Sequence, residues 1–209
     1  MSGIKKLAGQ TLWYGASSIA ARFLNYLLTP YLTYQMATNA YGEMSILYAA
    51  IPFLNVIFTY GLETAYFRYA TTKEQHEEVY NTATISLIFS TSILTAILIL
   101  FNQQFANLLR IPSHPEFFTL SALIIAFDAL TTLAFAKLRY EGRPVKFASV
   151  RIAGIIINLA CVFFLLSVCP RLYEKNANSF IHAFYNPNYK VGYVIIANLV
   201  HSVATFLFL

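Results

Sequence analysis

The stretch Val191–Leu209, VGYVIIANLVHSVATFLFL, decides the fold class of the chain. It holds no Asp, Glu, Lys or Arg, and its length is close to the roughly 20 apolar residues with which an α-helix crosses a bilayer. Lipid offers no water to the backbone, so such a stretch crosses as a helix whose amide groups bond to one another. Comparable apolar stretches recur earlier in the sequence, and together they predict an all-α polytopic membrane protein.

Composition supports six membrane-spanning helices. Mean hydropathy is +0.58, and only 11% of the residues are charged, against about 25% in soluble domains. Lys and Arg gather before the first apolar stretch and in the second and fourth connections, which by the positive-inside rule places the N-terminus in the cytoplasm. We expect the spans at residues 12–34, 41–66, 79–101, 117–136, 147–168 and 191–209.

Residues 1–209 are expected to form one N-terminal bundle of a larger assembly. The sequence stops at Leu209 without the basic flank that the other cytoplasmic helix ends carry. A second bundle is therefore expected to be missing, and either that C-terminal lobe or the second copy of a homodimer would complete the protein.

Several other classes of protein are disfavoured by the same residues. The net charge of +5 does not indicate nucleic acid, because the basic residues flank apolar runs instead of forming one patch. Cys161 and Cys169 have no metal-ligand or disulfide spacing, so neither a metal nor a cofactor is expected. The sequence lacks a Walker A loop and an HExxH motif, and its longest connection, 169–190, is short for a catalytic domain. We therefore expect no enzyme.

A polar stripe on the first span is the strongest candidate site. Its members are spaced seven, four, three and four residues apart, so they share one helical face. Arg22 follows Trp13 by nine residues, which at 1.5 Å per residue places it about 14 Å deep. Such a stripe faces protein or a water-filled cavity, and Ser18, Arg22 and Asn25 are its candidate binding residues. The stripe comprises Thr11, Ser18, Arg22, Asn25 and Thr29.

Asp128 is the expected counter-charge of Arg22. It precedes Lys137 by nine residues, so it too lies about 14 Å from the cytoplasmic edge. Two interpretations stay open. In one, Arg22 and Asp128 form an ion pair that locks two helices together. In the other, Arg22 lines a cavity and binds an anionic head group, while Asp128 tunes it.

Two further ionisable residues are candidates for coupling or gating. Glu63 lies five residues before Arg68 and is either a gating carboxylate or an interfacial charge that reaches out to water. His201 shares a helical face with Asn198 and is either a proton relay or a structural contact. Gly154 and Asn158 lie one turn apart, which predicts close packing between helices.

Several segments of the sequence form a recognisable combination. They are KKLAGQT at 5–11 with Arg22, Asn25 and Pro30 after it, Tyr41-Gly42-Glu43, YGLETAYFRY at 60–69, and RPVKFASVRI at 143–152 with Asn158. Together they resemble the oligosaccharide-lipid flippases (Wzx-type polysaccharide biosynthesis proteins) of the MATE-like MOP superfamily. The resemblance covers essentially the whole chain.

The resemblance implies two bundles around a cationic central cavity that Arg22 lines. Such proteins move an undecaprenyl-pyrophosphate-linked oligosaccharide across the bacterial inner membrane by alternating access, for surface polysaccharides such as the O-antigen of lipopolysaccharide. Lipid-linked oligosaccharide and membrane lipid are the implied partners. A drug or cation exporter of the same superfamily would be expected to have an acidic cavity, but the first span contains Arg22 and no Asp or Glu. A non-transporting scaffold half is the other alternative.

Overall fold

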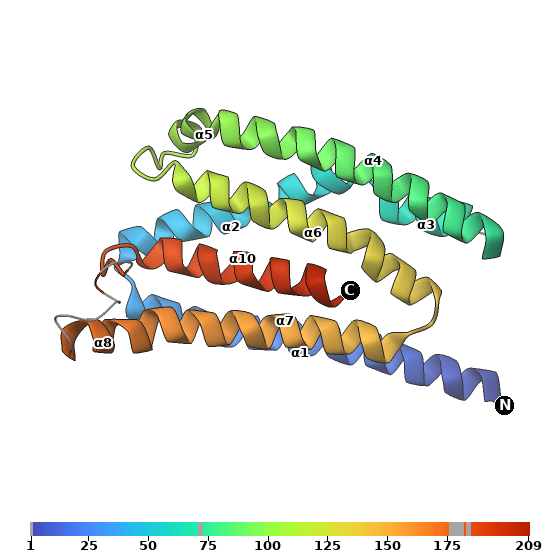
Figure 1. Ribbon diagram of the computed structural model, residues 1–209. Coiled ribbons are helices and arrows are strands. Elements are labelled where there is room, and N and C mark those ends of the chain that lie inside the picture. The colour runs from blue at the N-terminus through green and yellow to red at the C-terminus, as the bar shows by residue number, and fades with distance from the viewer. Residues whose placement is uncertain (1, 71–72, 176–181, 183–184) are drawn as a thin grey trace.

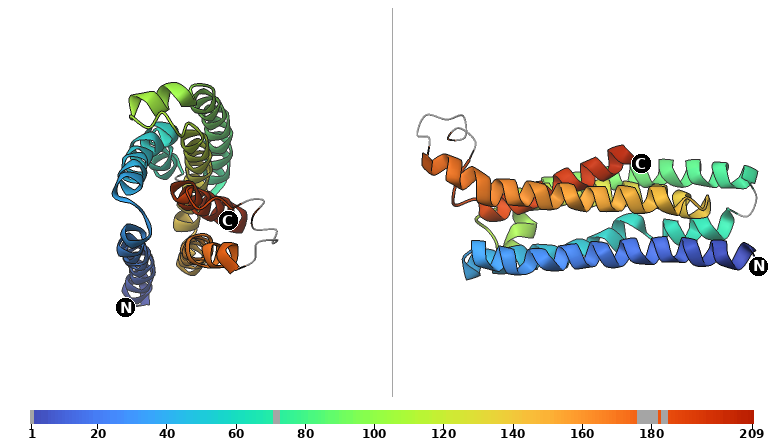
Figure 2. Two further views of the ribbon diagram at one scale, coloured as in Figure 1. Left: turned by 90° about the vertical axis from the view of Figure 1, so that its left-hand side faces the viewer. Right: turned by 90° about the horizontal axis from the view of Figure 1, so that it is seen from below.

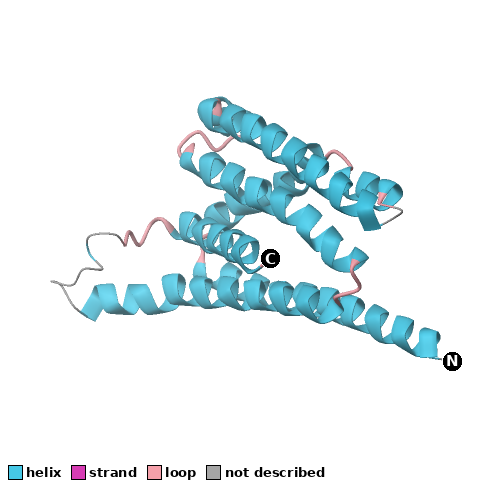
Figure 3. Ribbon diagram, turned by 45° about the vertical axis from the view of Figure 1, so that its right-hand side comes forward, coloured by secondary structure: helices cyan, strands magenta, loops and turns pink. Residues whose placement is uncertain are grey.

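The computed structural model describes residues 2–70, 73–175, 182 and 185–209, and within the helices it leaves out the side chains of 2–12, 17, 21, 25, 73, 74 and 175. The elements in this part of the chain are all helical (Figure 3). They are α1 (Ser2–Gln35), α2 (Thr38–Thr59), α3 (Leu62–Tyr69), α4 (Lys73–Leu100), α5 (Asn102–Leu108), α6 (Glu116–Tyr140), α7 (Pro144–Phe163), the π-helical turn η1 (Phe164–Val168), α8 (Cys169–Lys175) and α10 (Lys190–Phe208).

Five helical stretches within the described residues are long and apolar enough to cross a membrane. They correspond to the second through sixth expected spans, so the chain is an all-α membrane protein. The first expected span falls on α1, which lies alongside α7 (Figure 1), and its crossing of the membrane stays a prediction. The five stretches are Thr38–Tyr69, Gln75–Leu100, Glu116–Tyr140, Pro144–Glu174 and Lys190–Phe208.

The long helices run lengthwise beside one another in a single bundle. Neighbours follow the order α1, α7, α10, α6, α4, and α2 packs mainly on α6. The N-terminus and the turn between α6 and α7 lie at one end, called here the N-terminal end (Figure 1). The connection between α1 and α2, together with α5 and α8, lies at the opposite end, called here the far end.

The second expected span, 41–66, is not one continuous helix. Tyr60 and Gly61 have φ of 33° and 77°, in the left-handed region that glycine enters without steric cost. The helix therefore breaks at this pair, and α3 continues on a new course against α4 and α6. The break places Glu63, in the first turn of α3, beside α6.

The fifth helix is longer than the expected span, 147–168, which lies within it. The helix passes through η1 and continues as α8 to Lys175. Pro170 has no N–H to donate and its ring crowds the preceding turn, and a π-turn accommodates such a disruption inside a helix. Within this turn, the Ser167 hydroxyl lies 2.6 Å from the Tyr31 hydroxyl of α1.

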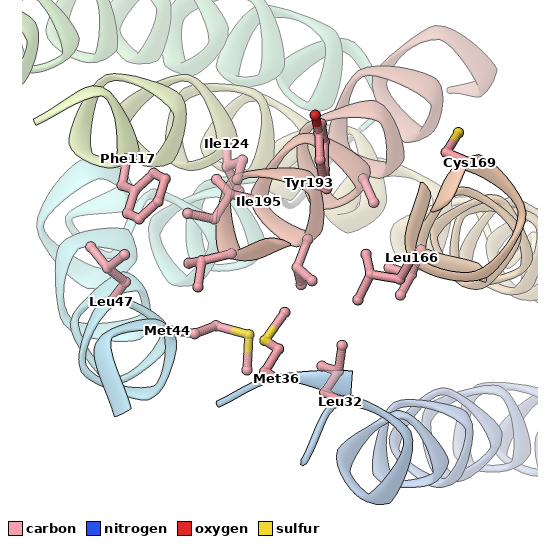
Figure 4. Packing of buried hydrophobic residues seen from close by; sticks show 14 of the residues in the cluster. Leu32, Met36, Met44, Leu47, Phe117, Ile124, Leu166, Cys169, Tyr193 and Ile195 are labelled. Carbon is pink, nitrogen blue, oxygen red and sulfur yellow. The ribbon is translucent and has the colours of Figure 1, made fainter. Parts of the chain in front are cut away.

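The main apolar core sits at the far end, where α1, α2, α6, α7 and α10 converge (Figure 4). Met36 and Met44 fill the space between α1 and α2, and Ile195 packs from α10. Lys190 donates a hydrogen bond of 2.7 Å from Nζ to the backbone oxygen of Gln35, which satisfies a free carbonyl at the end of α1. The far end is therefore well packed.

Gly154 allows α7 and α10 to approach closely, as predicted. A Cβ atom at this position would lie 2.6 Å from Thr205 Oγ1 and 2.8 Å from the His201 ring. Any larger residue would force α10 or these side chains to move.

We expect Gly154→Val to lower the melting temperature of the detergent-purified protein, because overpacking costs about 1–3 kcal/mol. Gly42→Val is the matched control, since a Cβ at Gly42 meets nothing within 4 Å. Thermal unfolding followed by intrinsic fluorescence measures both variants, and equal melting temperatures would contradict the close approach.

Candidate functional site: a charged cavity among apolar helices

A cavity of about 400 Å³ lies between α3, α6, α7 and α10. It unites residues that are far apart in sequence, and it holds both acidic and basic side chains although the surrounding helices are apolar. We call it the charged cavity. Its lining consists of Glu63, Asp128, Thr131, Thr132, Phe135, Arg139, Phe147, Arg151, His201 and Thr205.

Glu63 and Arg139 form an ion pair within this cavity. Arg139 Nη2 lies 2.7 Å from Glu63 Oε1, and both side chains are about one-third exposed. Arg139 Nε also donates to the backbone oxygen of Phe135 at 3.4 Å. Because the pair is partly open to solvent, it contributes at most about 1 kcal/mol, so another anion can compete with Glu63 for the guanidinium.

Phe147 holds two guanidinium groups at the cavity wall. The Cζ atoms of Arg139 and Arg151 each lie 5.8 Å from the centroid of its ring, within the range of cation–π attraction. The ring is fixed by edge contacts with Tyr14 at 5.0 Å and Phe135 at 5.1 Å. Two positive groups are therefore held close together before any ligand arrives, an arrangement suited to an anion with several oxygens.

Asp128 lies deeper, between α6, α2 and α10. Ser202, Asn55 and His201 lie near its carboxyl group, and all three are close enough to influence its charge. The hydroxyls of Thr131 and Thr132 bond to the Asp128 backbone oxygen at 2.9 Å and 3.0 Å. His201 and Asp128 thus share one polar region of the cavity.

The expected ion pair between Arg22 and Asp128 is not formed in the described part of the chain. Arg22 is exposed on α1, and its charge acts on Arg151 of α7. The physical reason is the neighbour order: α1 packs on α7, whereas Asp128 faces α2 and α10. The side chain of Asn25 lies outside the described residues, and binding by Ser18, Arg22 and Asn25 stays a prediction.

Sequence reasoning missed Arg139, Arg151 and Phe147 as site residues. Arg139 and Arg151 were counted as basic flanks that orient the helices, so their part in a cavity was overlooked. One signal was available. Phe147 and Arg151 are four residues apart and therefore adjacent on one helical face, which is the spacing that a ring beneath a guanidinium requires.

Comparison with known proteins agrees with this architecture. Residues 35–173 match a protein family described as polysaccharide biosynthesis protein. The matched range contains Glu63, Asp128, Arg139 and Arg151, while His201 lies beyond it. No curated protein and no solved structure matches the chain.

The cavity predicts that cysteines introduced at two adjacent positions of α6 will differ sharply in their reaction with a thiol reagent. With both natural cysteines replaced by Ala, we expect Thr132→Cys to react with a membrane-impermeant thiol reagent, because Thr132 lines the cavity. Leu133→Cys is the matched control and should stay unlabelled, since Leu133 is only 1% exposed. Mass spectrometry of the labelled protein measures both, and equal labelling would contradict a water-accessible cavity.

Proposed function

The chain belongs to the polysaccharide biosynthesis protein family, and we propose that it forms part of a flippase for lipid-linked oligosaccharides. Its cargo would be an undecaprenyl-pyrophosphate-linked oligosaccharide that crosses the bacterial inner membrane by alternating access. The observation that carries the proposal is the pair of guanidinium groups on Phe147, inside a cavity among helices that are apolar enough to span a membrane.

Pyrophosphate suits this pair of cations. Arg guanidinium groups donate charge-assisted hydrogen bonds to phosphate oxygens, often two at a time, and these bonds strengthen where water is scarce. The Glu63 carboxylate lies 2.7 Å from the Arg139 guanidinium. We infer that a phosphate oxygen takes the place of this carboxylate when the head group binds, and that Arg22 adds positive charge from α1.

The proposed orientation places the N-terminal end of the bundle in the cytoplasm. Arg139 lies in the last turn of α6 and Phe147 in the first turn of α7, both on that side, so the charged cavity would open toward the leaflet from which the cargo enters. Residues 1–209 would supply one wall of the transport path. A second bundle or a second copy of the chain would supply the facing wall and the rocking motion that alternating access requires.

A transporter of cations or drugs is less well supported by the same cavity. It would need a free acidic group, but Glu63 is paired with Arg139. Asp128 remains as an acidic group near His201, and we assign it the role of tuning or proton coupling instead of cargo binding. A transport role is also proposed in preference to an enzymatic one, because the cavity presents groups that bind an anion and no activated nucleophile.

We expect Arg151→Gln, introduced into the gene at its own locus, to reduce surface polysaccharide about tenfold or more. A lost charge-assisted hydrogen bond costs about 1.5–3 kcal/mol, and each 1.4 kcal/mol is a factor of ten. The matched control is Arg171→Gln, because Arg171 is exposed on α8 at the far end and does not line the cavity.

Polysaccharide on intact cells is measured by glycan staining, with protein abundance measured in parallel. Normal surface polysaccharide in the Arg151→Gln strain at unchanged protein level would overturn the proposed function.

A further inference from the structure

We propose that a second pocket, between α1, α2, α7 and α10, binds a sugar ring of the oligosaccharide next to the pyrophosphate. This inference rests on the function proposed above. The pocket has a volume of about 540 Å³, within the roughly 300–1,000 Å³ of small-molecule sites. We call it the amide pocket, after Asn158 and Asn198 in its lining.

The polar groups of the amide pocket are neutral. The described residues that line it include two amides and four hydroxyl-bearing residues, but no Asp, Glu, Lys, Arg or His. Tyr41 and Tyr48 add ring surface. A sugar has C–H faces that suit aromatic rings and a rim of hydroxyls that suit amides, and tyrosine offers both an apolar body and a polar tip. The hydroxyl-bearing residues are Thr29, Tyr41, Ser45 and Tyr48.

The side chain of Asn158 has an unused hydrogen-bond acceptor. Its Oδ1 atom is buried and has no hydrogen-bond partner among the described residues. Leaving such an acceptor unpaired costs about 1–3 kcal/mol, and a rotation of the Asn158 amide toward the pocket that it lines would let a sugar hydroxyl donate the missing bond. Ser45, in contrast, already donates to the backbone oxygen of Tyr41 at 2.8 Å, so its hydroxyl is largely committed.

The amide pocket and the charged cavity are neighbours, so one head group can occupy both. Asn198 of the amide pocket precedes His201 of the charged cavity by one turn of α10. Tyr48 lies near the Asn198 side chain and close enough to Asp128 for the two groups to interact electrostatically. A phosphate on Arg139 and Arg151 would therefore extend its attached sugar toward Tyr48 and Asn158.

Two other parts of the cargo fit the amide pocket less well. A prenyl chain would leave the amides without partners, at a cost of about 1–3 kcal/mol for each unpaired group. A phosphate would lose its hydration without meeting a positive charge, which is more costly still. The pocket is lined by residues of α1, α2, α7 and α10, helices whose arrangement is seen in Figure 2.

The test compares two ligands on the complete purified protein in nanodiscs. One is undecaprenyl pyrophosphate without sugar, and the other carries the oligosaccharide of the host. We expect Asn158→Leu to weaken binding of the sugar-bearing lipid about tenfold, the effect of about 1.4 kcal/mol, and to change binding of the bare lipid less than twofold. The control Asn81→Leu, on an exposed position of α4, should change neither.

Each outcome separates this inference from the proposed function. If wild-type protein does not bind the bare lipid, the proposed function fails. If it binds and Asn158→Leu weakens neither ligand, the sugar site is overturned. If Asn158→Leu weakens both ligands, Tyr48→Phe decides, because it removes one hydroxyl and keeps the ring. A selective loss for the sugar-bearing lipid then supports the site, and no selective loss overturns it.

Discussion

The attraction of two guanidinium groups to one phenyl ring is the interaction on which the rest of this structure depends. Arg139 and Arg151 belong to different helices, and Phe147 keeps both at 5.8 Å from its centroid. Charges among apolar helices are costly and need partners. Glu63 forms an ion pair with Arg139. This pair depends on the helix break at Tyr60 and Gly61, which turns α3 toward α6.

Residues on one face of α7 contribute to both the charged cavity and the amide pocket. Phe147, Arg151, Gly154 and Asn158 are spaced four, three and four residues apart, so they lie along one side of the helix. Phe147 and Arg151 line the charged cavity, Gly154 admits α10, and Asn158 lines the amide pocket. The order along this face matches the order of pyrophosphate and sugar in the proposed cargo.

Hydropathy predicted the membrane helices well because a backbone inside a bilayer must satisfy its own hydrogen bonds, which restricts apolar stretches of this length to helices. The second through sixth spans appear as five helices close to the expected ranges. The break at Gly61 was missed because a single glycine inside an expected span does not by itself predict a helix end. The extension of the fifth helix was missed because the expected span stops where the apolar run stops, whereas the helix continues through a π-turn into the polar residues of α8.

Neighbours within the membrane were harder to predict than depth. Counting residues from the interface gave Arg22 and Asp128 similar depths, but it carried no information on which helices touch. The packing of α1 on α7 separates these two residues and brings Arg22 toward Arg151 instead. The close approach at Gly154, in contrast, followed from a small residue one turn before a polar one, a local pattern that does not depend on helix order.

The central claim is that Glu63 occupies a site meant for a phosphate oxygen of the cargo. Affinity of the purified protein for undecaprenyl pyrophosphate tests this claim most directly, with Glu63→Gln and Arg139→Gln compared against wild type. The account predicts opposite effects. Glu63→Gln should bind up to about fivefold more tightly, since a partly exposed ion pair of at most about 1 kcal/mol no longer competes, and Arg139→Gln should bind more weakly. Weaker binding by Glu63→Gln, or unchanged binding by Arg139→Gln, would contradict it.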